Sequence, residues 1–247
     1  MLEPVAYQSK AIVLLSTRYK EDSAIITLVG EKGLFSLLAR GIYKMKSPLK
    51  PLLISGSLVY VEFKKSSEIS FASSVKVLWD SSELLTSYVS SLYLMYLEEL
   101  CLSLYQFDDP FPFDEILRIV QSLKNGDTLS LTLLTLGVLY RSLGIGLETQ
   151  NCVRCKKTKN IVGYSFQDGG FLCKDCIKEG DTLATDKNDL YVLKFTFHPL
   201  DEAVLSKKVF HENGMRMLCL LNDRLLSYFD LKKTKSFPLL LSALEQI

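Results

Sequence analysis

The sequence predicts an α+β protein, mainly β in its N-terminal part and mainly α in its C-terminal part. Short β-rich runs fill the first 80 residues, and a helical spacing of apolar residues begins at Ser82. Two matched cysteine pairs interrupt the helical part. The 247 residues are 48% hydrophobic and 23% charged, which is the composition of a globular protein with a buried core.

The N-terminal part, which we expect to be one domain at residues 1–80, contains five short runs rich in β-branched and aromatic residues. These runs lie at residues 11–15, 24–29, 34–38, 58–63 and 69–77. No long helical pattern separates them, so they predict a small barrel or sandwich. A five-stranded Greek-key barrel of the OB type is the arrangement that fits best.

The remaining residues, 81–247, read as a helical domain. Its first helix follows from apolar residues spaced three and four apart, at Leu85, Val89, Leu92, Tyr96, Leu100 and Leu104. Further helices are expected at residues 114–124, 127–144, 213–229 and 238–246, with Asp114 and Asp127 as N-caps. Residues 191–198 fit a strand as well as a helix.

The cysteine pairs form a module at about residues 150–180. Cys152 with Cys155 and Cys173 with Cys176 are two C-x₂-C pairs that enclose 17 residues. This spacing is typical of a four-thiolate zinc site, in which a hairpin brings the pairs together and no ligand position stays open. The sequence therefore predicts one structural zinc ion. A redox dithiol or two disulfides are the alternatives, and the matched second pair disfavours them.

Positive charge gathers around the loops of the predicted barrel. Residues 1–80 hold 11 Lys/Arg against 7 Asp/Glu, residues 81–150 hold 3 against 9, and residues 151–247 hold 15 against 12. In an OB barrel, the loops after strands 1 and 4 flank the ligand groove. The basic residues of these loops and of the segment after strand 3 are Arg18, Lys20, Arg40, Lys44, Lys46, Lys50, Lys64 and Lys65. As a group they predict a nucleic-acid-binding rim, although each lysine alone could be an ordinary solvated residue.

Catalytic chemistry is hard to find in this chain. Its histidines, His198 and His211, lie far apart, and no nucleotide-binding, zinc-protease, deaminase or nucleophile-elbow motif occurs. The apolar stretches at residues 84–104 and 129–147 contain charges or glycines and read as buried helices rather than membrane spans. The N-terminal residues have no signal-peptide pattern. We therefore expect a cytoplasmic protein that is not an enzyme and does not bind a membrane.

The sequence resembles the RecO family of bacterial DNA-repair proteins over nearly its whole length. The resemblance rests on residues 12–15 followed by Arg18, Tyr19, Glu21, Asp22 and Ser23, and then on residues 27–29, 31–34, 39–41 and Ser47. It continues with Leu143-Gly144, both cysteine pairs, Phe166 and Gly169-Gly170. Residues 145–150 lack the proline that the family commonly has before the first cysteine, and the C-terminal helices match only in character.

The resemblance implies a recombination mediator associated with the nucleoid. It implies binding to single- and double-stranded DNA, annealing of complementary strands, and help in exchanging single-strand-binding protein (SSB) for RecA. The implied protein partners are RecR, sometimes RecF, the SSB C-terminal tail and, indirectly, RecA. Because that tail is acidic and apolar, Arg118 and Arg141, which lie among leucines, are candidate contacts for it; pairing with nearby acidic residues is at least as good an explanation.

Other classes of protein remain open from the sequence. A zinc-containing factor could use the same barrel for RNA, which differs from DNA by its 2′-hydroxyl group. A nucleic-acid enzyme would need an active site that the sequence does not reveal. An interaction scaffold would bind only protein, and the basic rim argues against this.

Overall fold

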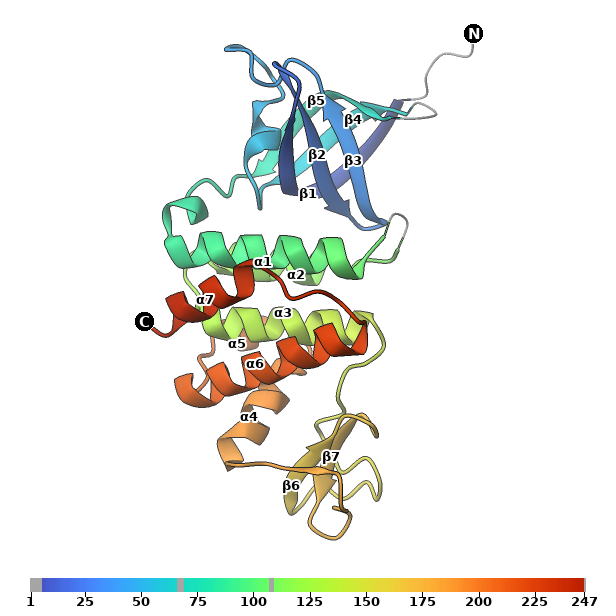
Figure 1. Ribbon diagram of the computed structural model, residues 1–247, viewed down its shortest axis with the longest axis vertical. Helices are drawn as coiled ribbons and strands as arrows, with labels where there is room; N and C mark the ends of the chain where they lie inside the picture. Colours follow the sequence, from blue (N-terminus) through green and yellow to red (C-terminus); the bar gives the residue numbers. More distant parts are fainter. Residues whose placement is uncertain (1–5, 66–68, 107–108, 247) are drawn as a thin grey trace. The chain divides into compact units, whose positions relative to one another are not determined.

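The computed structural model describes residues 6–65, 69–106 and 109–246 (Figure 1). These residues belong to two compact units. Unit 1 comprises residues 1–124 together with 234–247, and unit 2 comprises residues 125–233. The expected α+β class is confirmed, because a β-barrel comes first and helices follow.

Five strands form the barrel of unit 1. They are β1 (Ala6–Tyr19), β2 (Ser23–Gly30), β3 (Gly33–Ala39), β4 (Leu58–Lys64) and β5 (Phe71–Trp79). The barrel closes in the order β1-β2-β3-β5-β4, so the predicted OB-like barrel is confirmed. Its core includes Ile26, Leu28, Val59 and Val61, each fully buried. Burying one such side chain contributes about 1.5–3 kcal/mol.

Strand β1 is much longer than the predicted run at residues 11–15. Residues 6–12 pair with β4 and residues 11–19 pair with β2, with a register shift between Val13 and Leu15. The added residues are mostly polar or exposed, so their local pattern resembles a loop. They are strand because two different neighbours supply their backbone hydrogen bonds.

Three connections meet at one end of the barrel. Tyr43, in the segment after β3, donates its backbone N–H to Asp22 of the β1–β2 turn, over 3.4 Å from nitrogen to oxygen. The N–H of Leu38 donates to the carbonyl of Ser70, just before β5, over 2.8 Å. Strands β3 and β5 run parallel and pair only at Leu38 and Phe71 among the described residues. A short 3-10 helix, η1 (Lys50–Leu53), lies between β3 and β4.

Three helices complete unit 1: α1 (Tyr88–Leu104), α2 (Phe113–Ser122) and α7 (Ser236–Leu244). The first begins later than predicted, because η2 (Leu84–Thr86) precedes it and Ser87 caps it. The second begins at Phe113, so Asp114 lies in its first turn rather than at the N-cap. A carboxylate still stabilises that position, since it faces the positive end of the helix dipole.

The C-terminal helix α7 packs against α1 although 130 or so residues separate them in the chain. The Glu99 carboxylate accepts hydrogen bonds from the N–H and the hydroxyl of Ser236, at 3.1 and 2.8 Å. The rings of Tyr96 and Phe237 lie 5.2 Å apart between their centroids. These contacts fix the first turn of α7 on the middle of α1.

Gly33 occupies the β2–β3 turn with a φ of +90°, a conformation that other residues rarely adopt. A Cβ atom at this position would lie 2.5 Å from the carbonyl oxygen of Asp109. Glycine is therefore required both by the turn and by the backbone atoms of Gln106 and Asp109 that lie beside it.

Unit 2 is built around the apolar helix α3 (Thr128–Ser142), which Asp127 caps as predicted by accepting from the Ser130 N–H. It packs against α4 (Lys187–Thr196) and α6 (His211–Tyr228), and α5 (Glu202–Leu205) is a single turn. Residues 191–198, which fit strand or helix from the sequence, are mostly helical in α4. Gly137 lets α3 approach α4, because a Cβ there would clash with the Thr196 carbonyl.

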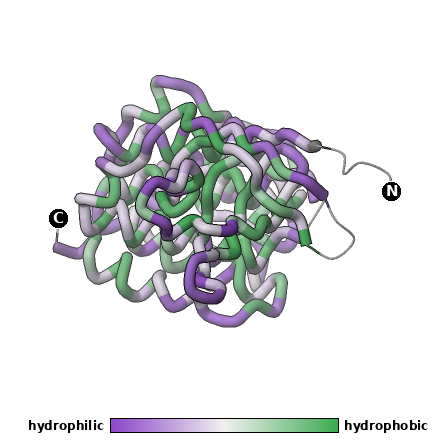
Figure 2. The backbone as a smooth tube through the Cα atoms, turned by 90° about the horizontal axis from the view of Figure 1, so that it is seen from above, coloured by the Kyte–Doolittle hydropathy of each residue, from purple (hydrophilic) through white to green (hydrophobic). Residues whose placement is uncertain are grey.

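A small sheet of β6 (Ile161–Ser165), β7 (Gly170–Cys173) and β8 (Thr182–Leu183) carries the cysteine module. Short hydrophobic and hydrophilic stretches alternate along the backbone in Figure 2. Among the described residues, no helix combines the length and the apolar character that crossing a membrane requires.

Glu98 on α1 gives unit 1 a predictable dependence on pH. Burial raises the pKa of this carboxyl to about 7 from 4.5, and the charge of Glu99 adds to the effect. The folded chain therefore binds the proton more tightly than the unfolded chain, and stability falls as the pH rises through this interval.

At about pH 8 Glu98 is charged although it is partly buried, and Glu98→Gln removes this unfavourable charge. We therefore expect the substitution to raise the free energy of unfolding by about 1 kcal/mol, a small gain because solvent screens a half-exposed carboxylate. At about pH 4 the substitution should have almost no effect. Urea unfolding followed by the fluorescence of Trp79, the single tryptophan, measures both values. An equal gain in the free energy of unfolding at the two pH values would contradict a raised pKa of Glu98.

Candidate nucleic-acid interface and metal centre

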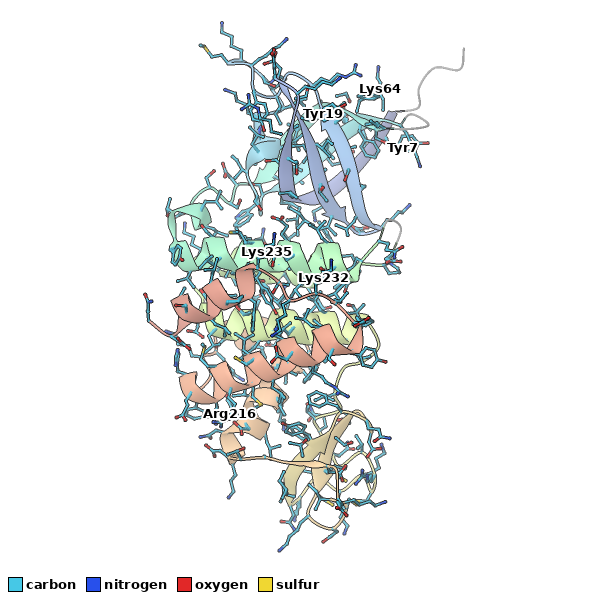
Figure 3. The ribbon with its side chains drawn as sticks, viewed as in Figure 1. Tyr7, Tyr19, Lys64, Arg216, Lys232 and Lys235 are labelled. Carbon is cyan, nitrogen blue, oxygen red and sulfur yellow. The ribbon has the colours of Figure 1, made fainter. Side chains whose placement is uncertain are left out.

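The barrel carries a groove of about 900 Å³ that begins at the N-terminal half of β1 and runs along β3. The residues that line it include Tyr7, Phe35, Phe63, Tyr19 and Ile25. Because β3 pairs with β5 at a single described position, most of that edge of β3 faces the groove. Figure 3 shows Tyr7, Tyr19 and Lys64 on the barrel. A concave surface with aromatic walls is suited to a planar ligand.

Three aromatic rings in the groove form a continuous stack. Phe35 packs against the barrel core, and its ring centroid lies 5.6 Å from that of Phe63. Phe63 in turn stacks on Tyr7 over 5.7 Å, with 19° between the ring planes. Tyr7 is the outermost ring and is 42% exposed. The stack therefore connects the barrel core to solvent.

All eight predicted cations are exposed. Five lie in connections, whereas Arg18 belongs to the end of β1, Lys64 to the end of β4 and Lys50 to the start of η1. Arg18 lies with its guanidinium carbon 5.2 Å from the centroid of the Tyr43 ring, and it donates a 3.2 Å hydrogen bond to the Glu21 carbonyl. Lys20 forms the β1–β2 turn with a φ of 56°, and its ammonium lies 5.3 Å from the Tyr19 ring.

The segment after β3 holds four of these cations in different ways. The Arg40 guanidinium lies 4.3 Å from the centroid of the Phe71 ring, a cation–π contact that fixes its position. Lys50 donates to the carbonyl of Met45 over 2.9 Å, which ties it to its own loop. Lys44 and Lys46 are exposed on the same loop.

Lys64 ends β4, directly opposite Phe71 in the strand register. Lys65 is the single member of the predicted set that lines the groove. Its ammonium lies 5.9 Å from the centroid of the Tyr7 ring. Lys10 and Lys32 also line the groove and were not predicted. The only available signal for Lys10 was its place beside a run that is longer than its apolar residues suggest.

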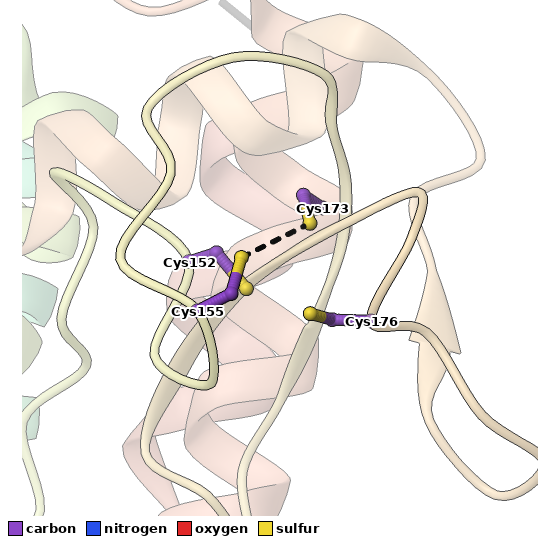
Figure 4. Close-up of side chains that lie close together, drawn as sticks. All are labelled: Cys152, Cys155, Cys173 and Cys176. Atoms are coloured by element: carbon purple, nitrogen blue, oxygen red, sulfur yellow. Dashed lines mark hydrogen bonds between the residues drawn. The ribbon is translucent and has the colours of Figure 1, made fainter.

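The four cysteines come together in unit 2 as their spacing predicted. Their sulfur atoms all lie within 4.8 Å of one another, and those of Cys155 and Cys173 are 3.5 Å apart (Figure 4). Among the described residues, this is the cluster of cysteine, histidine and carboxylate side chains that is close enough to hold a metal ion. A tetrahedron with metal–sulfur bonds of ~2.3 Å has edges of about 3.8 Å, which fits this arrangement.

Tight backbone turns position the sulfurs. The N–H of Lys156 donates to the carbonyl of Cys152 over 2.8 Å, and Lys156 has a φ of 63°. In the second pair, the N–H of Cys176 donates to the carbonyl of Cys173 over 3.0 Å. The β6–β7 hairpin connects the two turns, so both pairs face one point.

Backbone N–H groups also tune the acidity of the cluster. Burial raises the pKa of Cys152, but the N–H groups of Cys173, Cys155 and Arg154 outweigh it and lower the pKa to about 6. Hydrogen bonding to Cys155 is the largest cause that raises the pKa of Cys176 to about 12. A divalent cation bound by the four sulfurs would displace the thiol protons.

Arg154, between the first two cysteines, holds the module together and was missed from the sequence. Its guanidinium donates to Asp168 in the β6–β7 turn, over 2.8 Å, and to both carboxylate oxygens of Asp181, over 2.6 and 2.9 Å. It also donates to the Cys176 carbonyl. Hydrogen bonding from Arg154 holds the pKa of Asp181 below its ordinary value. One side chain therefore joins three loops around the sulfurs.

The remaining predicted residues lie in different compact units. Arg118 is half-buried on α2 of unit 1. Arg141 is half-buried near the end of α3 in unit 2, where it donates to the His198 carbonyl over 3.4 Å. His198 follows α4 and His211 begins α6.

The OB-like barrel, the helices and the four-cysteine cluster together define a two-part protein with a candidate metal centre in its helical part. Two family models match this organisation. The model for the N-terminal part of recombination protein O matches residues 5–79, and the model for its C-terminal part matches residues 85–229. The chain therefore belongs to the RecO family.

Curated relatives agree with this assignment. The DNA repair protein RecO of Halalkalibacterium halodurans is 25% identical over 177 residues, which cover 70% of each chain. The protein of the same name from Clostridium acetobutylicum is 29% identical over 185 residues, covering 72% of this chain and 75% of the relative. The one from Caldicellulosiruptor bescii is also 29% identical over 185 residues, covering 70% and 73%.

We expect purified chain to carry about one metal ion, and Cys173→Ser to lose most of it, because one thiolate of the tetrahedron is removed. The variant should unfold more easily in its helical part, while Trp79 fluorescence should show that the barrel remains folded. Elemental analysis measures the metal. Cys219→Ser, a partly exposed cysteine outside the cluster, is the matched control. Metal content equal to that of the natural chain in Cys173→Ser would rule out this centre.

Proposed function

We propose that this chain is a non-enzymatic recombination mediator that acts on DNA during repair. The observation that carries the proposal is the aromatic groove with cationic loops on an OB-like barrel, in a chain whose relatives are named DNA repair proteins. Lysine and arginine side chains neutralise phosphates, and an open aromatic ring stacks on a base. The groove offers both kinds of group.

The proposed activity is binding to single- and double-stranded DNA, annealing of complementary strands and assistance in replacing SSB with RecA. Annealing needs a surface that lowers the repulsion between two phosphate backbones. The exposed cations at one end of the barrel are suited to this, because they lie in or beside three connections that approach one another there. We propose Arg18, Lys20, Arg40, Lys44, Lys46, Lys50, Lys64 and Lys65 as the contacts.

We propose that residues 1–80 bind nucleic acid and that residues 81–247 bind partner proteins. RecR, RecF and the acidic SSB tail are the proposed protein partners, with RecA engaged indirectly. A DNA-bound protein of this kind would work in the cytoplasm, at the nucleoid.

The proposed metal is zinc, in a structural role. Four thiolates favour this ion, and they fill its tetrahedral shell, so no position is left for a reacting water. The small core beneath the cluster contains Leu172 with parts of Val153, Ile161 and Ile177. A core of that size needs a metal to stay folded.

Strand annealing on SSB-coated complementary oligonucleotides, without added nucleotide, tests the function. Annealing faster than the spontaneous rate supports a mediator. The same assay with RNA strands tests the alternative of a zinc-containing RNA-binding factor. Binding to RNA with no affinity for DNA would favour that alternative, and absence of binding to either would contradict both.

For the cationic loops, we expect Lys44→Ala to weaken binding alike on every DNA sequence and to reduce the salt slope by about one, since phosphate contacts carry no sequence information. Arg40→Ala should cost more, because its planar guanidinium is held on Phe71 and can clamp a phosphate with two hydrogen bonds. Fluorescence anisotropy in a salt titration measures both.

Changing Arg40, Lys44 and Lys46 to alanine together should abolish annealing and leave the metal content unchanged. Lys207→Ala, an exposed lysine in unit 2, is the control. A folded triple variant with unaltered affinity and salt slope would place the DNA contacts elsewhere, with Lys156, Lys157 and Lys159 of the cysteine module as the next candidates.

The SSB tail is expected to bind beside Arg118 or Arg141, because an acidic peptide with apolar residues needs a cation within an apolar surface. The Arg118→Ala, Arg141→Ala double variant should bind the tail peptide at least tenfold more weakly, a loss of about 1.4 kcal/mol. Isothermal titration with the isolated peptide measures this loss. If the double variant bound the tail peptide with the affinity of the natural chain, the two arginines would not be its binding site.

A further inference from the structure

We propose that Tyr7 is a base-stacking platform that makes the groove selective for the unpaired bases of single-stranded DNA. This inference rests on the proposed function, because it assumes that DNA enters the groove. It assigns to the groove a different task from that of the cationic loops. The loops contact phosphates of any strand, whereas the Tyr7 ring stacks only on a base that is unpaired.

The geometry of the aromatic stack carries the first step. Tyr7 lies parallel to Phe63 within 19°, and Phe63 rests on Phe35, which is packed against the barrel core. The inner face of Tyr7 is thus fixed by two rings. A ring held in this way loses little conformational entropy when a base stacks on it. Its 42% exposure shows that part of the ring stays open to solvent.

The lysines beside the tyrosines carry the second step. Lys65 places its ammonium 5.9 Å from the Tyr7 ring, and Lys20 places its ammonium 5.3 Å from the Tyr19 ring. Tyr7 and Tyr19 both line the same groove. Each aromatic–lysine pair offers a flat surface for a base and a positive charge for the adjoining phosphate. A lysine on a flexible stem can move from the ring to a phosphate when a base takes its place.

The nature of the platform decides the substrate class. The flat faces of bases in a duplex are covered by their neighbours, so a protein ring can stack on a base only after it is unstacked. A single strand presents these faces without that cost. Stacking of this kind tolerates every base, which suits a protein that must act at any sequence. A peptide in the groove would explain the apolar walls but not the lysine beside each tyrosine.

The test compares Tyr7→Leu with the natural chain for binding to three probes of equal length: a thymidine oligonucleotide, a duplex, and an oligonucleotide whose sugars carry no bases. We expect Tyr7→Leu to weaken binding to the thymidine strand about tenfold, because one base–aromatic stack is lost. The salt slope should not change, because no phosphate contact is removed. Binding to the duplex and to the baseless strand should not change. Tyr7→Phe should keep the natural affinity, because it keeps the ring.

Tyr88→Leu is the matched control, since Tyr88 is 68% exposed on α1 and does not line the groove. Trp79 fluorescence reports whether each variant keeps its barrel. Should Tyr7→Leu fail to fold, the natural chain still decides the matter, because it must prefer the thymidine strand to the baseless one. Equal binding of those two strands, or an equal loss by Tyr7→Leu on single strand and duplex, would overturn the inference. Binding of a peptide in place of DNA would overturn it too. If the natural chain bound no DNA at all, the proposed function itself would fail.

Discussion

Closure of the barrel by β1 is the constraint on which the rest of unit 1 depends. This one strand pairs with β4 through residues 6–12 and with β2 through residues 11–19, and it must bend near Val13 to do so. The bend lets a single strand contribute Tyr7 and Tyr19 to the same groove. It also brings the turn after β1 to the loops after β3 and β4, so the exposed cations gather at one end.

The sheet of unit 2 depends on a different kind of stabilisation from the barrel, because it is too small to bury a hydrophobic core. Three short strands and a few apolar side chains surround the four cysteines. Backbone N–H groups stabilise the thiolate of Cys152, and Arg154 neutralises Asp168 and Asp181 while it joins their loops. The polar contacts thus preorganise the sulfurs, and a metal ion would supply the energy that the apolar contacts cannot.

The sequence predicted the features whose signals are local. Five β-rich runs predicted the barrel. The two C-x₂-C pairs predicted the sulfur cluster, because their spacing along the chain determines which side chains meet. The groove could not be predicted, since Tyr7, Phe35 and Phe63 come from three strands and meet only when the barrel closes. The N-terminal half of β1 looked like a loop for the same reason. Residues 191–196 are helical because Asp186 caps the helix that contains them and α3 packs against it, and neither effect is visible in their own pattern.

The return of α7 to α1 makes the barrel-containing unit discontinuous, with unit 2 inserted between its two pieces. The Glu99 carboxylate accepts hydrogen bonds from Ser236, and the Tyr96 ring contacts that of Phe237, so both depend on the C-terminal helix. During synthesis, the ribosome releases those residues after all of unit 2. The cysteine-bearing unit can therefore fold first, while α1 still exposes part of its apolar face, and the earliest part of the chain is the last to be completed. Folding of unit 2 shortens the distance that the C-terminal piece must search, because it brings residues 125 and 233 into one compact body.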